Sequence, residues 1–306
     1  MRVAIFGGTG FVGSYLLDAL LEAGHEPTVL VRPGSEGKVR SAERCRLVAG
    51  DIGSDAAIRA TLESCEAAIY NIGILRAFPS QGITFEELQF NGLARVVEAA
   101  KQVGVGRLLL MSANGVKPGG TDYQDTKYRA EQCAMQSPLD VTVFRPSVIF
   151  GDPRGAMEFA TQLHHDMVAM PLPAVGFFSG LRPGEGEILM SPVHIQDVAQ
   201  AFVHALEEPS TIGEIYSLGG PEVLSWQEMI QRIAAAVGRK KRILPMPVQV
   251  MKIGATLLDW LPSFPVTRDQ LTMLTEGNTA DPAEIQSLIG QEPRPFTAQN
   301  LSYLRG

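Results

Sequence analysis

The chain has 306 residues, a formal net charge of −7, and 45% hydrophobic against 19% charged residues. This length suffices for one large core, or for a core and a smaller lobe, and the composition is that of a globular α/β protein. An acidic chain lacks the basic surface that neutralises phosphates, so we expect no nucleic-acid partner. No apolar run reaches the length of a membrane span, so we expect no transmembrane helix.

The cysteines and histidines show no metal-ligand pattern. Cys45, Cys65 and Cys133 are scattered, and His164 and His165 have no neighbouring ligands at metal spacing. The sequence therefore predicts reduced thiols and no metal site. No signal peptide precedes the first predicted strand, so we expect a cytoplasmic protein.

The most informative segment is the glycine-rich loop at residues 7–13, which lies between a buried strand (2–6) and an apolar helical stripe (14–21). Strand, tight turn and helix in this order are the context that a dinucleotide-binding loop requires. The first glycine permits the turn, the second lets a pyrophosphate approach the backbone, and the third lets the helix pack on the sheet. The phosphates would bind free N–H groups at the start of the helix. The predicted cofactor contacts here are Gly7, Thr9, Gly10, Phe11, Val12 and Gly13.

Strand and helix patterns alternate along the next part of the chain. Strands are predicted at residues 28–31, 46–48, 67–70, 107–111 and 141–144, and helices at 55–63, 84–103 and 122–135. Apolar strands that alternate with helices predict an α/β fold, a doubly wound parallel Rossmann sheet with helices on both faces. Ligands bind at the carboxyl ends of such strands, which brings Asn71, Gly73 and Pro146 to the predicted cofactor site.

The end of the second strand indicates which dinucleotide binds. A carboxylate about 20 residues after the glycine loop would bind the ribose 2′-hydroxyl of NAD(H), but this position holds Arg32, with Lys38 close behind. A guanidinium can hold a 2′-phosphate, which favours NADP(H) over NAD(H); a solvated loop cation is the alternative. Asp51 and Ile52, after the third strand, would flank the adenine, and Asp51 could equally be a turn residue.

Tyr123 and Lys127 form a second group of candidate functional residues. They are four residues apart on a predicted helix, which Thr121 or Asp122 can cap, so their side chains share one face. A nearby ammonium stabilises a phenolate, so we expect Lys127 to lower the pKa of Tyr123 toward neutrality while it binds the nicotinamide ribose. Such a pair also arises by chance on a solvated helix, but its place after the fifth strand favours catalysis.

These motifs resemble the short-chain dehydrogenase/reductase superfamily in its extended or atypical branch. The likeness is greatest to bacterial relatives of the NADPH-binding accessory subunit of respiratory complex I. Further segments match that branch in chain order: the segment around Asn91 and residues 145–151, 191–199, 216–221, 224–229 and 266–274. The resemblance implies cofactor contacts from Asn91 and Val148.

One position departs from the catalytic pattern of that superfamily, which places a Ser or Thr just after the fifth strand to polarise the substrate carbonyl. The segment here is Met-Ser-Ala-Asn-Gly at residues 111–115. Ser112 supplies the hydroxyl, or else the register places Ala113 at the carbonyl and Asn114 acts as a substitute amide donor. The candidate catalytic residues are therefore Tyr123, Lys127, Ser112 and Asn114.

The predicted domains are a cofactor domain at residues 1–150, with 191–218 returning to it, and a smaller, mostly helical C-terminal substrate lobe at 151–190 and 219–306. The Pro- and Gly-rich segment 171–187 predicts a loop, whose Phe177 and Phe178 would line a pocket for a hydrophobic substrate or mark a partner surface. Asp197 is expected to cap the helix that follows it.

Residues 239–261 combine a basic run with an apolar helical segment. This segment could bind an anionic membrane surface, which would place the protein at the inner face of the membrane, or it could bind a protein partner. A helix that covers the lobe or lies at a subunit interface is the alternative. No sequence feature indicates the oligomeric state.

Two functions are consistent with these features. The first is an NADP(H)-dependent oxidoreductase or epimerase that binds a dinucleotide and a small-molecule carbonyl or hydroxyl substrate. The second, which the complex I resemblance implies, is a non-catalytic structural or assembly protein in which bound NADPH stabilises the fold.

Overall fold

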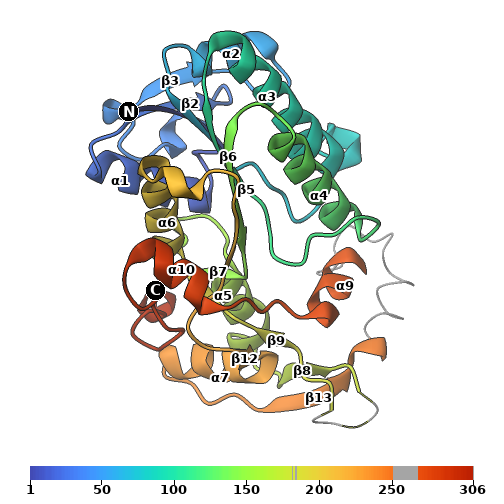
Figure 1. Ribbon diagram of the computed structural model, residues 1–306. Coiled ribbons are helices and arrows are strands. Elements are labelled where there is room, and N and C mark those ends of the chain that lie inside the picture. Colours follow the sequence, from blue (N-terminus) through green and yellow to red (C-terminus); the bar gives the residue numbers. More distant parts are fainter. Residues whose placement is uncertain (181, 183–184, 251–267, 306) are drawn as a thin grey trace.

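The computed structural model describes residues 1–180, 182, 185–250 and 268–305. Its centre is a seven-stranded sheet in the order β11-β6-β5-β4-β1-β2-β3, with every neighbouring pair parallel (Figure 1). The strand order reverses between β1 and β4, and open α/β sheets bind ligands in the crevice at such a point. The strands are β1 (Arg2–Phe6), β2 (Glu26–Val31), β3 (Arg46–Ala49), β4 (Ala67–Tyr70), β5 (Arg107–Met111), β6 (Asp140–Pro146) and β11 (Ile215–Leu218).

Helices cover both faces of the sheet, because alternate strand residues point to opposite sides. Val3 and Ile5 of β1 pack in one core with α1 (Phe11–Glu22), α6 (Ile195–Glu207) and α10 (Pro282–Ile289). Ala4 and Phe6 pack in a second core with α2 (Asp55–Leu62), α3 (Gly92–Val103) and α4 (Asp122–Met135). The predicted α/β class and the doubly wound parallel sheet are confirmed.

A second lobe lies below the carboxyl edge of the sheet in Figure 1. Its core gathers around Phe150, Trp226 and Phe296. The lobe contains α5 (Phe159–Leu163), η5 (His164–Val168), α7 (Trp226–Ala236), α9 (Arg268–Glu276), η7 (Ser302–Arg305) and the paired strands β8 (Ala174–Phe178) with β13 (Ile243–Pro247) and β9 (Leu189–Met190) with β12 (Leu224–Ser225). Strands β7 (Ile149–Phe150) and β10 (Val193–His194) pair where the chain leaves and re-enters the sheet domain.

Several predicted boundaries agree with the structure, and one helix differs. The segments predicted at residues 67–70, 107–111 and 122–135 are β4, β5 and α4. The helix predicted at 84–103 begins with a π-helical part, η4 (Glu86–Asn91), before α3. The remaining short helices are η1 (Glu36–Lys38), η2 (Ala42–Arg44), η3 (Pro79–Gln81) and η6 (Pro209–Thr211).

The expectation for Phe177 and Phe178 is wrong. Both belong to β8, which pairs with β13, and they are only 5% and 2% exposed. The ring of Phe177 lies 5.6 Å from that of Trp226. They are therefore core residues of the second lobe, because pairing with a distant strand turned this segment inward.

The expected cap at Asp197 is also wrong. His194 caps α6 by accepting a hydrogen bond from the Gln196 N–H (3.3 Å). Asp197 is fully buried in the first turn, where its carboxylate accepts hydrogen bonds from the backbone N–H and the guanidinium of Arg294. A distant arginine decides the role of this carboxylate.

The predicted substrate lobe also included residues that pack elsewhere, since α10 lies against α6 on the sheet domain. Within the described ranges, none of the helices combines the length and hydrophobicity that crossing a bilayer requires.

Candidate functional site

The glycine loop turns tightly between β1 and α1. Gly7 has φ +104°, and a Cβ there would lie 2.9 Å from the main chain of Asn71 at the end of β4. A Cβ on Gly13 would lie 2.2 Å from the Gly7 carbonyl oxygen, so only glycine lets α1 start this close to the sheet. The nearest atom to a Cβ on Gly10 is 3.8 Å away, which leaves the surface of the loop open at that point.

The start of α1 fits an anionic ligand. Its N-cap is Gly10, which has no capping side chain, and its first turn contains no acidic residue. The N–H groups and the positive end of the helix dipole are therefore not neutralised by the helix itself. Together with the open surface at Gly10, this geometry fits the pyrophosphate of a dinucleotide.

A cavity of about 1190 Å³ extends from the glycine loop along the carboxyl edge of the sheet. Ligand pockets usually measure about 300–1,000 Å³, so this cavity has room for a dinucleotide and a second ligand. Of the predicted site residues, Gly13, Lys38 and Asn91 do not line it. Those that line it are Gly7, Thr9, Gly10, Phe11, Val12, Arg32, Asp51, Ile52, Asn71, Gly73, Ser112, Asn114, Tyr123, Lys127, Pro146 and Val148.

The end of the cavity that is predicted to hold the adenosine lies at the ends of β2 and β3. Arg32 is exposed, lines the cavity and has no ion-pair partner in the described part of the chain. Asp51 lines the cavity and also closes a turn, because its Oδ1 accepts a hydrogen bond from the Gly53 N–H (2.8 Å). Both interpretations of Asp51 are therefore compatible with its position, whereas Ile52 is buried.

Lys127 is buried between the ends of β4 and β5. Its Nζ donates to the Met111 carbonyl oxygen (2.8 Å) and lies beside Gly73, 3.5 Å from where a Cβ would stand. An ammonium has three donors, so two remain available for a ligand. Burial lowers the pKa of Lys127 to about 8, and the nearby Glu131 partly opposes this shift.

Tyr123 lies one turn earlier on α4 and lines the same cavity. Its ring packs edge-on against Phe85, with centroids 5.9 Å apart. Burial raises the pKa of Tyr123 to about 12. The expected shift toward neutrality is therefore wrong for the protein alone, because loss of hydration outweighs any stabilisation of the phenolate by Lys127.

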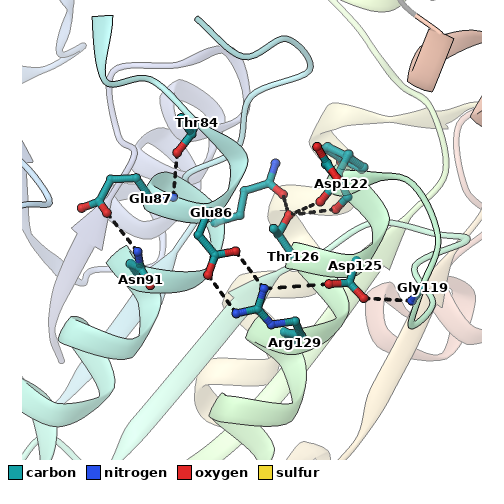
Figure 2. A network of polar contacts seen from close by, with 11 residues as sticks. Thr84, Glu86, Glu87, Asn91, Gly119, Asp122, Asp125, Thr126 and Arg129 are labelled. Atoms are coloured by element: carbon teal, nitrogen blue, oxygen red, sulfur yellow. Dashed lines mark hydrogen bonds and ion pairs between the residues drawn. The ribbon is translucent and has the colours of Figure 1, made fainter. Parts of the chain in front are cut away.

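The helix that carries this pair is held firmly in place (Figure 2). Thr121, not Asp122, is its N-cap, in a capping box with Gln124. Arg129 forms two 2.8 Å hydrogen bonds to Glu86 of η4, and Thr126 donates to Gln89 (2.8 Å). These contacts set the position of Tyr123 along the cavity wall.

Asn91 belongs to the same polar network rather than to the cavity. Its Nδ2 donates to Glu87 (3.0 Å), as Figure 2 shows. The side chain therefore stabilises the η4–α3 segment. Asn91 does not line the cavity, so its predicted contact with the cofactor stays a prediction.

The two candidates for the carbonyl-orienting group are in different situations. Ser112 Oγ is buried, and within the described residues it has no hydrogen-bond partner, while Ala113 lines the cavity half-buried. Asn114 Nδ2 donates to Asn278 Oδ1 (2.9 Å) and to the Thr279 carbonyl oxygen (2.8 Å). Both amide hydrogens of Asn114 are thus engaged, and Ser112 holds the free hydroxyl.

Comparison with known proteins identifies the family of the chain. The profile of a family described as NAD(P)H-binding matches residues 7–169. The chain belongs to this family. It is 24% identical to the NADH-ubiquinone oxidoreductase 40 kDa subunit of Neurospora crassa, over 98% of this chain and 78% of that protein.

A second relative of this NAD(P)H-binding protein is the ceramide reductase of Caulobacter vibrioides, 24% identical over 84% of this chain and 77% of the relative. The solved UDP-glucuronic acid 4-epimerase of Bacillus cereus shares the fold, with a TM-score of 0.73 and 18% identity over 100% of this chain and 98% of the other. The resemblance to extended short-chain dehydrogenases and to complex I accessory subunits is confirmed.

Sequence reasoning missed the part of the site that comes from the second lobe. Met157, Phe159, Met190 and α9 line the cavity. The end of α9 is tied to α4 and to the loop before it, because Glu276 accepts a hydrogen bond from Gln124 of α4 (2.7 Å) and pairs with Lys117 of the loop (2.5 Å). These contacts join residues about 150 positions apart, and no local pattern in the sequence signals them.

The segment proposed as a membrane or partner site is described only as far as residue 250, and residues 251–261 lie outside the described residues. In the described part, Arg239 donates to the Ala169 carbonyl (3.1 Å) and Lys241 to the Val168 carbonyl (3.2 Å). Two of the four basic side chains therefore bind carbonyls around the end of η5.

Proposed function

We propose that the protein is an NADP(H)-dependent oxidoreductase that acts on a carbonyl or hydroxyl group. The observation that carries this proposal is that Tyr123, Lys127 and Ser112, whose buried hydroxyl has no hydrogen-bond partner among the described residues, line one cavity that begins at the glycine loop. When bound, the cofactor supplies or accepts a hydride at its nicotinamide ring. The side chains of the protein must bind the ribose and transfer one proton to or from the substrate oxygen.

Each of the three side chains has a role that fits its surroundings. Lys127 binds the nicotinamide ribose with the donors that Met111 leaves free. Ser112 orients the substrate oxygen with its unpartnered hydroxyl. Tyr123, whose pKa is raised to about 12, carries its proton at neutral pH and donates it to the oxygen of a carbonyl substrate.

The preference for NADP(H) over NAD(H) rests on Arg32. Its guanidinium lines the adenosine end of the cavity and has no ion-pair partner among the described residues, so it is available to a 2′-phosphate. Lys38 lies outside the cavity lining and contributes at most long-range attraction.

Tyr123→Phe tests the proposed reaction. Removal of the phenolic oxygen should lower kcat/KM by about 10²–10⁴ and leave NADPH binding intact. The assay follows NADPH absorbance with ketones, aldehydes and hydrophobic quinones. Tyr128→Phe, on the same helix but outside the cavity lining, is the matched control and should keep full activity. Undiminished turnover by Tyr123→Phe would refute the proposed acid.

A structural or assembly protein that holds NADPH is the second candidate. Two observations favour it: relatives include complex I subunits, and Asn114 donates its amide hydrogens to residues 278–279, which leaves neither for a substrate. Such a protein would keep NADPH through purification, show no turnover with any substrate of the screen, and melt at a higher temperature with NADPH than without it.

The expected localisation differs between the two candidate functions. An enzyme of this kind would be cytoplasmic, whereas an assembly protein would sit against a protein or membrane partner. The exposed basic side chains Lys240 and Arg242 are the described groups that could meet an anionic membrane surface. Co-sedimentation with vesicles that contain about 30% phosphatidylserine, compared with neutral vesicles, measures this attraction.

A further inference from the structure

Beyond Tyr123, apolar side chains form much of the cavity wall. Two walls face each other there: the loop that follows β4 and helix α9. Gln270 of α9 donates to the Leu75 carbonyl (3.3 Å), so the walls meet across the opening. Leu75 and Phe78 of the loop and Met273 and Leu274 of α9 line the space between them.

The rim of this space is apolar and exposed. Leu75 and Met157 are each 61% exposed and Phe78 is 44% exposed, and all three line the cavity. Exposed apolar side chains grouped around an opening mark a binding site more often than a chance surface feature. Methionine on two sides of the space adapts to ligands of varied shape.

The charged groups of this part of the cavity already have partners within the protein. Glu276 pairs with Lys117, and Glu158 accepts hydrogen bonds from two backbone N–H groups and from the hydroxyls of Thr161 and Tyr303. Arg76 lies over the ring of Phe78, 6.0 Å from its centroid. The described lining therefore offers no cluster of cations for a diphosphate, although the fold is shared with an epimerase of nucleotide sugars.

We infer that the substrate is an uncharged amphiphile, with one oxo or hydroxyl group at Tyr123 and a long apolar chain that lies against Leu75, Phe78, Met157 and the apolar face of α9. The placement of the polar end rests on the proposed reaction. The placement of the chain rests on the apolar walls alone.

Binding is measured without turnover, so that the two proposals can fail separately. The uncharged probe N-phenyl-1-naphthylamine is bound to the protein in the presence of NADPH and displaced by 2-alkanones of six to twelve carbons. Each buried methylene should tighten binding by up to about fourfold. UDP-glucose should not displace the probe, and displacement by it at micromolar concentration would overturn the inference.

Matched variants test where the apolar chain of the ligand binds. Leu75→Asp and Met157→Asp replace exposed residues of the rim and should flatten the dependence of affinity on chain length. Leu172→Asp, at a site that is 65% exposed and outside the cavity lining, should leave the dependence unchanged. Equal loss in Leu172→Asp and Leu75→Asp, or no chain-length dependence in the unmodified protein, overturns the inference.

The same 2-alkanones then serve as substrates. If binding depends on chain length but NADPH is not oxidised, the proposed reaction is overturned and the binding site for the apolar chain is supported. If NADPH oxidation depends on Tyr123 but is equally fast with short and long ketones, the reaction is supported and the binding site for the apolar chain is overturned.

Discussion

The glycine-loop end of the cavity and its far end beside α9 differ in the part of the chain that builds them. One seven-residue loop and the strand and helix that flank it form the first end, and its fit depends on backbone atoms and on missing Cβ atoms. The far end takes side chains from the loop after β4, from Met157 and from α9. Positions where only glycine lets the backbone come close to another group tolerate few substitutions, whereas positions in an apolar wall tolerate many. Binding of the cofactor should therefore be easy to abolish, and selection of the substrate should be easy to change.

The largest expected effect comes from the glycine-loop end. Gly13→Ala puts a Cβ 2.2 Å from the Gly7 carbonyl oxygen, and overpacking of this kind should lower the free energy of unfolding by about 1–3 kcal/mol. NADPH binding should be lost with it. Urea denaturation and isothermal titration calorimetry measure the two effects.

Gly10→Ala is the matched control for stability, since the nearest atom to its Cβ would be 3.8 Å away. Its stability should stay within about 0.5 kcal/mol of the unmodified protein, while NADPH affinity should fall because the methyl group enters the pyrophosphate site. Equal destabilisation by the two substitutions would show that close packing is not the role of Gly13.

A pH effect of about 2 kcal/mol is expected at Lys127. Burial lowers its pKa to about 8 in the folded protein, against about 10.4 in an unfolded chain. The unfolded state binds more protons between these values, so the free energy of unfolding of the unmodified protein should rise from pH 8 to pH 10 relative to Lys127→Met. Urea denaturation without NADPH at both pH values is the measurement, and parallel curves would contradict the buried ammonium.

The proposed preference for NADPH over NADH should amount to about 1.4 kcal/mol, a tenfold difference in Kd. Arg32→Ala should weaken NADPH binding about tenfold and leave NADH binding unchanged. Lys38→Ala, at a neighbouring cation outside the cavity lining, should change either affinity by less than about twofold. Equal affinity of the unmodified protein for NADPH and NADH would overturn the assignment.

The smallest effect is expected at the far end. Glu276→Gln weakens the tie between α9 and α4 and should raise KM for the substrate by about two- to fourfold, with NADPH affinity unchanged. Glu222→Gln breaks an ion pair of similar exposure with Arg232, outside the cavity lining, and is the control. Steady-state kinetics of the two variants distinguishes a wall of the site from a distant surface pair.

The sequence by itself predicted the sheet, the dinucleotide loop and the helix of Tyr123 and Lys127. Each depends on local rules: a strand followed by glycines, alternating apolar segments, and a spacing of four on a helix. Residues 67–70, 107–111 and 122–135 were placed correctly for this reason. The family resemblance agreed with the glycine loop and with the helix of Tyr123 and Lys127 because they carry its motifs.

Only the tertiary structure decided the rest, because contacts between distant residues change what a side chain does. Arg294 makes Asp197 a buried partner instead of a cap, and β13 turns Phe177 into the lobe core. Burial reverses the expected pKa shift of Tyr123. The far end of the cavity includes α9, which Glu276 ties to Gln124 of α4, and no sequence period encodes a contact across about 150 residues.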